Sequence, residues 1–523
     1  MPTTTDAVEP SAPRGRAQRT LDMLERHPWR TLGVYALLLA IQISPWWYAS
    51  KDDCLYISVA RSMVRGEQMH CLGNGRIFVG PGFPALLAPA FFLGERPFLA
   101  LSIIQWVISL GLIAGVYQWC RRHDPERAAL LTGFCILNIT VWYYFRRPLK
   151  EIAFLTALVW SINLLHPLTE RLPLRRTIWL CVGGSALLVF ALFVRLTGIM
   201  LVPAFCLAMG WQAWQKRLAW SRAALLATTV SIIGCSAVLG QVIYDKQQEK
   251  VNGWRHSYAK SFTTRVAETN SSLLLAGLRD RIGEVGRIVL PGTFKIYADA
   301  NGPFKFIEVL FLIATAVLIT GWIVLVRGRI ELMALMLPFY AGIYALNAVS
   351  QGARLAVPMS PVLLLCFWLG LRQVARCDIR MLGGLTVAHL CVAISYWIGI
   401  DLPRARAADQ HWAAVDRVVE TVGDETVAFS SDLKTARSML LITFDRVVLD
   451  YAPESGDSAA EASIPGEQIV IPEEARHPKW IVSGSGEPID GYELHSETNG
   501  LKLFKTRSEI PVLAAPIETG MRR

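Results

Sequence analysis

Apolar segments recur along the first 400 residues of this 523-residue chain, each close to the ~20 residues that a helix needs to cross a bilayer. They predict about eleven transmembrane helices, and hence a polytopic α-helical membrane protein. The expected helices are residues 31–48, 97–120, 128–145, 149–165, 177–194, 197–211, 223–244, 306–326, 331–348, 355–371 and 381–400. Residues 84–93 form a further, partial insertion in this scheme, so the number is good to about one helix.

The pattern changes at residue 401. Five apolar residues share one face of a helix that ends at Gly423: Trp412, Val415, Val418, Val419 and Val422. One more helix is expected at 433–441. Short strands are expected at 426–429, 446–451, 468–471, 479–483, 492–495 and 501–505. Residues 401–523 therefore predict a small soluble α/β domain.

An amphipathic helix is predicted between the first two spans. Its apolar positions recur on one face: Leu55, Tyr56, Val59 and Met63. Gly66 ends the pattern, and a Gly/Pro-rich turn at residues 80–84 leads into the next apolar sequence. A helix of this kind rests in the membrane interface, where it would hold the adjacent carboxylates Asp52 and Asp53 at the water–lipid boundary.

Composition supports the membrane assignment, since 53% of the residues are hydrophobic and only 18% are charged, against roughly a quarter in soluble proteins. The net charge of +10 comes largely from basic turns that set topology, so it does not indicate nucleic-acid binding. These turns place the N-terminus inside. Residues 1–28 are then a disordered cytoplasmic tail without a signal peptide, 29–400 the membrane domain, and 49–96, 245–305 and 401–523 lie outside.

The ten cysteines show no metal-ligand spacing. Most lie within apolar segments and are interpreted as packing residues. Cys54 and Cys71 both fall in the first outer loop, and the sequence leaves open whether they form a disulfide or remain thiols.

Cations at short outer turns are not needed for topology. The chain has five of them: Arg146, Arg147, Lys150, Arg195 and Arg354. Each one alone could snorkel to the interface or pair with a carboxylate such as Glu151. Their convergence on the face that presents Asp52 and Asp53 indicates instead a site for an anionic head group, because the guanidinium fork suits phosphate.

Five short motifs follow one another along residues 30–400: KDDCLY at 51–56, GPGFP at 80–84, PLKE at 148–151, FVRLTG at 193–198 and QGARLAVP at 351–358. Their order resembles the GT-C class of membrane glycosyltransferases, above all the families of protein O-mannosyltransferases and of bacterial transferases that place aminoarabinose or other sugars on lipid A. The chain departs from that class at three positions. Asp53 replaces the usual Glu, Lys150 stands where a small residue usually precedes the Glu, and Thr197 is displaced from its usual place in the motif around Arg195. The C-terminal domain lies outside the resemblance.

The resemblance implies an enzyme that takes its sugar from a polyprenyl-phosphate donor and transfers it on the non-cytoplasmic side with inversion. Asp52 is the candidate base for the acceptor, and Asp53 would orient the acceptor or a cation. Without the resemblance, both would be interpreted as carboxylates that cap a helix start.

The leaving lipid phosphate needs preorganised cations. Arg354 is the first candidate and Arg195 the second, followed by Arg147 and Lys150. Tyr56 and Glu151 are expected to bind substrate. No cofactor is expected besides the lipid-linked co-substrate, and a tightly held divalent cation is not favoured.

Two other functions stay open: a transporter or flippase of lipid-linked sugars, and a polysaccharide ligase or polymerase. The expected partners are the bilayer, the polyprenyl-phosphate sugar, and a glycolipid, glycan or protein acceptor. The expected location is a bacterial inner membrane, with the active site and C-terminal domain on the periplasmic or extracellular face. Residues 245–305 and 401–523 are expected to select the acceptor. The sequence does not identify the sugar, the acceptor or the lipid length.

Overall fold

The computed structural model describes residues 16–47, 51–66, 80–145, 147–252, 285–286, 288–290, 305–328, 330–346, 354, 356–423 and 425, and the segments 427–430, 449–451, 461–462, 479–483, 492–498 and 501–506. Within these ranges the chain forms two compact units. The first joins Met1–Pro45 to Phe78–Asp401, and the second joins Trp46–Ile77 to Leu402–Arg523. The segment with the acidic pair therefore belongs to the same unit as the C-terminal residues.

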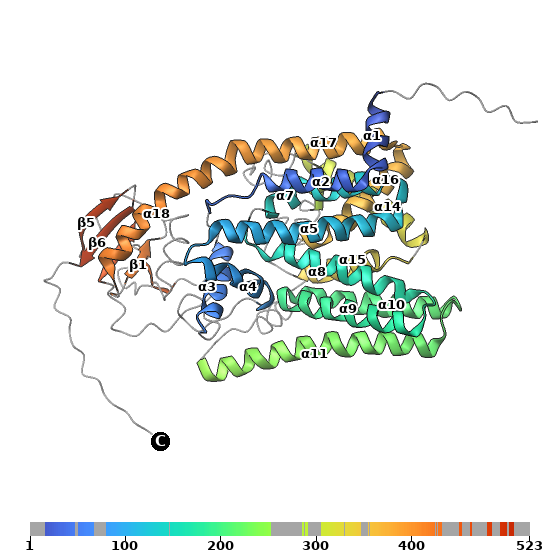
Figure 1. Ribbon diagram of the computed structural model, residues 1–523, viewed down its shortest axis with the longest axis horizontal. Helices are drawn as coiled ribbons and strands as arrows, with labels where there is room; N and C mark the ends of the chain where they lie inside the picture. The colour runs from blue at the N-terminus through green and yellow to red at the C-terminus, as the bar shows by residue number, and fades with distance from the viewer. Residues whose placement is uncertain are drawn as a thin grey trace, which may run out of the picture. The chain divides into compact units, whose positions relative to one another are not determined.

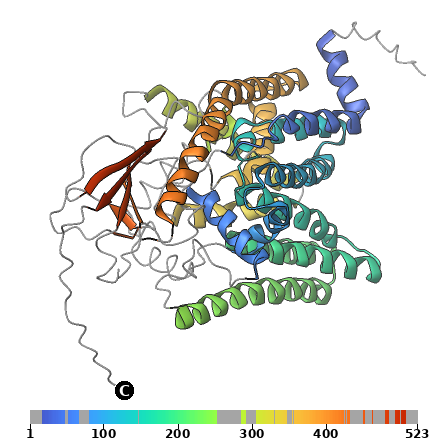
Figure 2. The same ribbon diagram turned by 60° about the vertical axis from the view of Figure 1, so that its left-hand side comes forward.

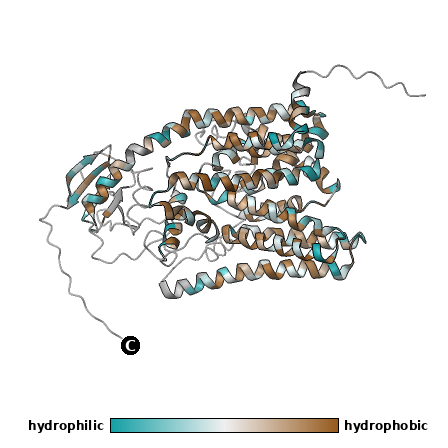
Figure 3. Ribbon diagram, in the orientation of Figure 1, coloured by the Kyte–Doolittle hydropathy of each residue, from teal (hydrophilic) through white to brown (hydrophobic). Residues whose placement is uncertain are grey.

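The first unit is built from long apolar helices. They are α5 (Phe98–His123), α8 (Lys150–Leu165), α9 (Leu174–Val194), α10 (Leu201–Trp214), α11 (Trp220–Asn252), α14 (Lys305–Gly328), α16 (Ser360–Ala375) and α17 (Ile379–Tyr396). Figures 1 and 2 show α5, α8 and α9 side by side, and Figure 3 shows the hydrophobic character of their length. Among the described residues, eight helices are long and apolar enough to cross a membrane.

A bent pair and two short helices account for the difference from the eleven predicted spans. The pair α6 (Ala128–Ile136) and α7 (Ile139–Phe145) makes a ninth span if it counts as one, with a bend of 64°. Predicted span 31–48 is the 13-residue helix α2 (Pro28–Ala40), and predicted span 331–348 is the 15-residue helix α15 (Leu332–Leu346). At about 1.5 Å per residue, neither is as long as the hydrocarbon core is thick. The apolar segment 84–93 forms the short α4 (Gly82–Leu87) and η1 (Ala88–Leu93).

The bend has a local cause at Asn138. Its side-chain oxygen accepts a hydrogen bond of 3.0 Å from the backbone N–H of Thr140, and its amide nitrogen donates 2.6 Å to the carbonyl of Ile288. Because the side chain caps the start of α7, it competes with continuation of α6.

Short α15 nevertheless connects the two ends of the first unit. Just before it, Glu331 lies at the C-terminal ends of α5 and α8, where its Oε2 is 3.2 Å from His123 Nε2 and 3.8 Å from His166 Nδ1. Beyond it, Arg354 bonds Glu151 in the first turn of α8. The chain therefore passes from one end of α8 to the other between residues 331 and 354.

Short α2 makes a similar passage. Tyr35 donates a 3.2 Å hydrogen bond to the carbonyl of Ala129, which lies beyond the C-terminal end of α5. Ser44 N–H donates 3.1 Å to Ser102 Oγ, in the first turns of α5. The 13-residue helix and the residues after it thus cover much of the length of α5.

Helices α14 and α16 meet through glycine. A Cβ atom added to Gly321 would overlap the carbonyl oxygen of Cys366, and one added to Gly370 would overlap that of Val317. This approach of two backbones is the small-residue packing found between helices in membranes.

The second unit contains α3 (Lys51–Val64), α18 (Leu402–Val422) and a six-stranded sheet in the order β3-β2-β1-β4-β6-β5. The strands are β1 (Val427–Ser430), β2 (Leu449–Tyr451), β3 (Glu461–Ala462), β4 (Trp480–Ser483), β5 (Tyr492–Thr498) and β6 (Leu501–Thr506). β2, β1 and β4 are parallel, and the other pairs are antiparallel. The predicted helix end at Gly423 is confirmed, as are five predicted strands. Predicted elements 433–441 and 468–471 lie outside the described residues.

Candidate functional site

Three charged side chains converge in the first unit. Glu151 is fully buried in the first turn of α8, and Arg195, directly after α9, is 5% exposed. Arg195 Nη1 lies 3.8 Å from Glu151 Oε1, and Arg354 Nε donates a hydrogen bond to the same oxygen. We call these three residues the arginine–glutamate cluster.

Helix ends position each member of the cluster. Arg195 has extended backbone angles (φ −158°, ψ 121°), which end α9, while its N–H still donates 2.7 Å to the carbonyl of Ala191. Leu149 is also extended and lets α8 start at Lys150, so that Glu151 occupies a helix N-terminus, where a carboxylate is favoured. Arg354 precedes η7 (Val357–Met359), which leads into α16.

The cluster joins two cations to one carboxylate. Arginine stays protonated in proteins, so both guanidinium groups carry a positive charge beside Glu151. Within the described part of the chain, Glu151 Oε2 is buried and accepts no hydrogen bond. Cations in a low-dielectric position interact with an anion more strongly than they would in water.

The other cations predicted at this site have contacts of their own. The Arg147 guanidinium carbon lies 4.2 Å above the ring centroid of Tyr143, and the Arg147 carbonyl accepts 3.1 Å from Gln105. Lys150 is the first residue of α8 and is half-buried. Arg146 lies outside the described residues.

The acidic pair begins α3, in the second unit. Asp53 is fully buried, and its Oδ2 accepts a hydrogen bond of 3.3 Å from the indole nitrogen of Trp47. Tyr56, one turn later, is 2% exposed. The backbone of Asp52 belongs to α3, and its side chain lies outside the described residues, as does Cys71. Arg61, in the same helix, is only 5% exposed.

Two sets of contacts were not predicted from the sequence. Aromatic residues lie next to the acidic pair: Trp47 bonds Asp53 and stacks on Trp412, and Trp46 lies under Arg406. The only signal for them was the adjacent Trp pair ahead of the two aspartates. At the opposite end of α8 from Glu151, Glu331 accepts 2.8 Å from Trp119 Nε1 and faces His123 and His166. Among the described residues, no group of three or more His, Cys, Asp or Glu side chains is arranged to hold a metal ion.

The chain is not similar in sequence to any curated protein, and no family model matches it. Its structure is similar to that of ArnT from Cupriavidus metallidurans in the apo state, with a TM-score of 0.57 and 13% identity, over 91% of this chain and 97% of ArnT. With ArnT bound to undecaprenyl phosphate, the TM-score is 0.55 at 10% identity, over 92% and 99% of the two chains.

A second protein has a similar structure over less of its own length. This is the archaeal oligosaccharyltransferase AglB from Archaeoglobus fulgidus, in complex with an inhibitory peptide and a dolichol-phosphate. The TM-score is 0.50 at 14% identity, over 88% of this chain and 70% of AglB. ArnT and AglB are GT-C membrane glycosyltransferases, and this chain has their fold.

Proposed function

We propose that this protein is a membrane glycosyltransferase that moves a sugar from a polyprenyl-phosphate donor to a lipid, glycan or protein acceptor. The observation that carries the proposal is the convergence of Arg195 and Arg354 on the buried Glu151, from three different elements. This arrangement supports an anion site on a GT-C fold. ArnT bound to undecaprenyl phosphate and AglB in complex with a dolichol-phosphate show that proteins of this fold take polyprenyl phosphates.

In the proposed reaction, an acceptor oxygen attacks the anomeric carbon from the face opposite the phosphate. The bond from that carbon to the phosphate oxygen breaks, so the configuration inverts and polyprenyl phosphate leaves. Asp52 takes the acceptor proton, a role that contributes about 10²- to 10⁴-fold in rate. Asp53 and Tyr56 hold the acceptor in place.

The arginines act on the leaving group. Negative charge grows on the phosphate as the bond breaks, and a fixed guanidinium stabilises that charge without reorganisation. Arg354 and Arg195 are assigned this role, with Arg147 and Lys150 contributing at longer range. Glu151 keeps the two guanidinium groups in position when no phosphate is bound.

We place the protein in a bacterial inner membrane, with the reaction on the non-cytoplasmic face. The C-terminal residues 401–523 and the segment 245–305 are proposed to select the acceptor. Neither the sugar nor the acceptor follows from the observations above.

The test uses purified protein in liposomes with polyprenyl-phosphate sugars and candidate acceptors, and follows release of free polyprenyl phosphate. Wild-type release that is lost in Asp52→Asn supports the proposed transferase and base. A matched control is Glu126→Gln, because Glu126 is an exposed carboxylate of the predicted inner turn and should release lipid like wild type. Equal release by wild type and Asp52→Asn would remove Asp52 from its role. Movement of lipid-linked sugar across the bilayer without release would favour a flippase.

A further inference from the structure

The C-terminal helix α18 contacts the start of the acidic segment inside the second unit. The rings of Trp412 and Trp47 stack with centroids 5.9 Å apart and planes inclined by 26°. The Arg406 guanidinium carbon lies 5.6 Å from the ring centroid of Trp46. Two neighbouring tryptophans ahead of the acidic pair thus meet two residues of one helix, far away in sequence.

One of these tryptophans also reaches the acidic pair. The indole nitrogen of Trp47 donates to Asp53 Oδ2 at 3.3 Å, and all three side chains are buried: Trp47 is 6%, Trp412 8% and Asp53 0% exposed. A buried carboxylate requires hydrogen-bond donors. Indole offers one donor in the plane of its ring, so the direction of that plane determines which carboxylate oxygen it can reach.

From these contacts we infer that Trp412 is a positioning residue for the acidic pair, acting through Trp47 on Asp53. The stack holds the indole plane of Trp47, and the indole N–H holds the Asp53 carboxylate. Asp52 precedes Asp53 in the same first turn of α3, so a displacement of Asp53 also displaces Asp52. A misplacement of about 1 Å in a catalytic group can cost about 10²-fold in rate. The inference rests on the proposed function, because it assumes that this pair serves the acceptor.

A purely structural role predicts something different. If the two tryptophans only pack the unit together, replacing Trp47 with Phe should be tolerated, since the ring can still stack. If the indole N–H orients Asp53, the same change removes the donor and slows turnover.

The experiment measures kcat and donor KM in proteoliposomes, together with amide hydrogen exchange of residues 51–64. For Trp412→Ala we expect a 10- to 100-fold lower kcat, a donor KM within about twofold of wild type, and faster exchange of α3. Trp412→Phe should restore most of the activity, while Trp47→Phe should remain about tenfold slow with normal exchange in the membrane helices. The control is Trp179→Ala, because this α9 tryptophan is 68% exposed.

Each failure has a distinct meaning. Unchanged kcat in both Trp412→Ala and Trp47→Phe overturns the positioning role while leaving the transferase intact. If wild type transfers no sugar from any donor, the proposed function fails. Hydrogen exchange of α3 then tests by itself whether Trp412 holds the start of this helix. Unchanged exchange of α3 in Trp412→Ala would then overturn the inference as well.

Discussion

At the scale of single residues, the candidate site depends on one carboxylate shared by two arginines. Glu151 Oε1 receives both contacts, and the side chain has no exposed surface. Such a group contributes little net stability as a pair, because desolvation offsets the attraction. It matters because a buried cation such as Arg195 is costly without a counter-charge.

Removal of Glu151 should make the protein depend on an added anion. We expect Glu151→Gln to lower the free energy of unfolding by about 3–5 kcal/mol, since it removes the buried carboxylate that pairs with Arg195 and Arg354. Added polyprenyl phosphate would replace the lost charge. Its effect on the Tm of Glu151→Gln should therefore exceed its effect on wild type. An equal shift in the two proteins would mean that the lipid phosphate does not reach the arginine–glutamate cluster.

Activity should depend on both the charge and the planar shape of the Arg354 side chain. Arg354→Gln removes a cation from the proposed leaving-group site, and we expect kcat/KM for the lipid donor to fall by about 10²-fold. Arg354→Lys keeps the charge but loses the planar fork, so an intermediate loss of about tenfold is expected. Arg380→Gln serves as the control, because its side chain is 58% exposed. If the Gln and Lys variants of Arg354 both retain full activity, the phosphate lies elsewhere.

At the scale of elements, helix packing in the first unit rests on small residues. Gly370 of α16 leaves no room for a Cβ beside the carbonyl of Val317, whereas Gly384 of α17 has nothing within 4 Å. We expect Gly370→Ala to lower the free energy of unfolding by about 1–3 kcal/mol through overpacking. Gly384→Ala should raise it by about 0.5–1 kcal/mol, because alanine favours the helix. Thermal unfolding in detergent measures both, and equal Tm values for the two variants would contradict the close α14–α16 contact.

Sequence periodicity predicts most elements but not their interruptions. The apolar face of α18 and its end at Gly423 could be predicted, because both depend on local residues. The break at Asn138 was not predicted, although the cap of α7 is local, because a single Asn within an apolar segment can also continue the helix, and its amide contact with the carbonyl of Ile288 is far away in the chain. Likewise, Arg195 and Arg354 were expected to converge on an anionic head group, but their shared contact with one Glu151 oxygen was not predicted. The Trp47–Trp412 stack had no local signal beyond the adjacent Trp46–Trp47 pair, because Trp412 is far away in the chain.

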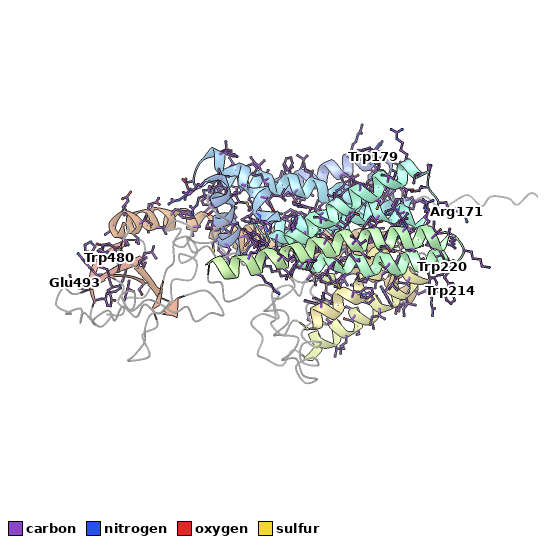
Figure 4. All side chains as sticks on the ribbon, turned by 90° about the horizontal axis from the view of Figure 1, so that it is seen from below. Arg171, Trp179, Trp214, Trp220, Trp480 and Glu493 are labelled. Atoms are coloured by element: carbon purple, nitrogen blue, oxygen red, sulfur yellow. The ribbon has the colours of Figure 1, made fainter. Side chains whose placement is uncertain are left out.

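At the scale of the whole molecule, the number of passages through the membrane decides which side each turn faces. Length and composition give eight or nine spans within the described residues. The contacts of Glu331 and Arg354 add α15, and those of Tyr35 and Ser44 add α2. With the bent pair counted once, we propose eleven passages among the described residues. Figure 4 shows Arg171, Trp214 and Trp220 at the same end of the helices of the first unit. In the proposed topology this end faces the cytoplasm.

The passage through α15 gives this proposal a direct test. Among the described helices between Arg171 and the C-terminal residues, α9, α10, α11, α14, α16 and α17 are long and apolar enough to cross, and α15 would make the number odd. Arg171→Cys and Glu493→Cys, each in a background without the native cysteines, should therefore react with a membrane-impermeant maleimide from opposite sides. In intact spheroplasts we expect labelling at residue 493 alone, with residue 171 labelled only after permeabilisation. Labelling of both from the same side would mean that α15 does not cross, and the C-terminal unit would then share the face of the basic turns.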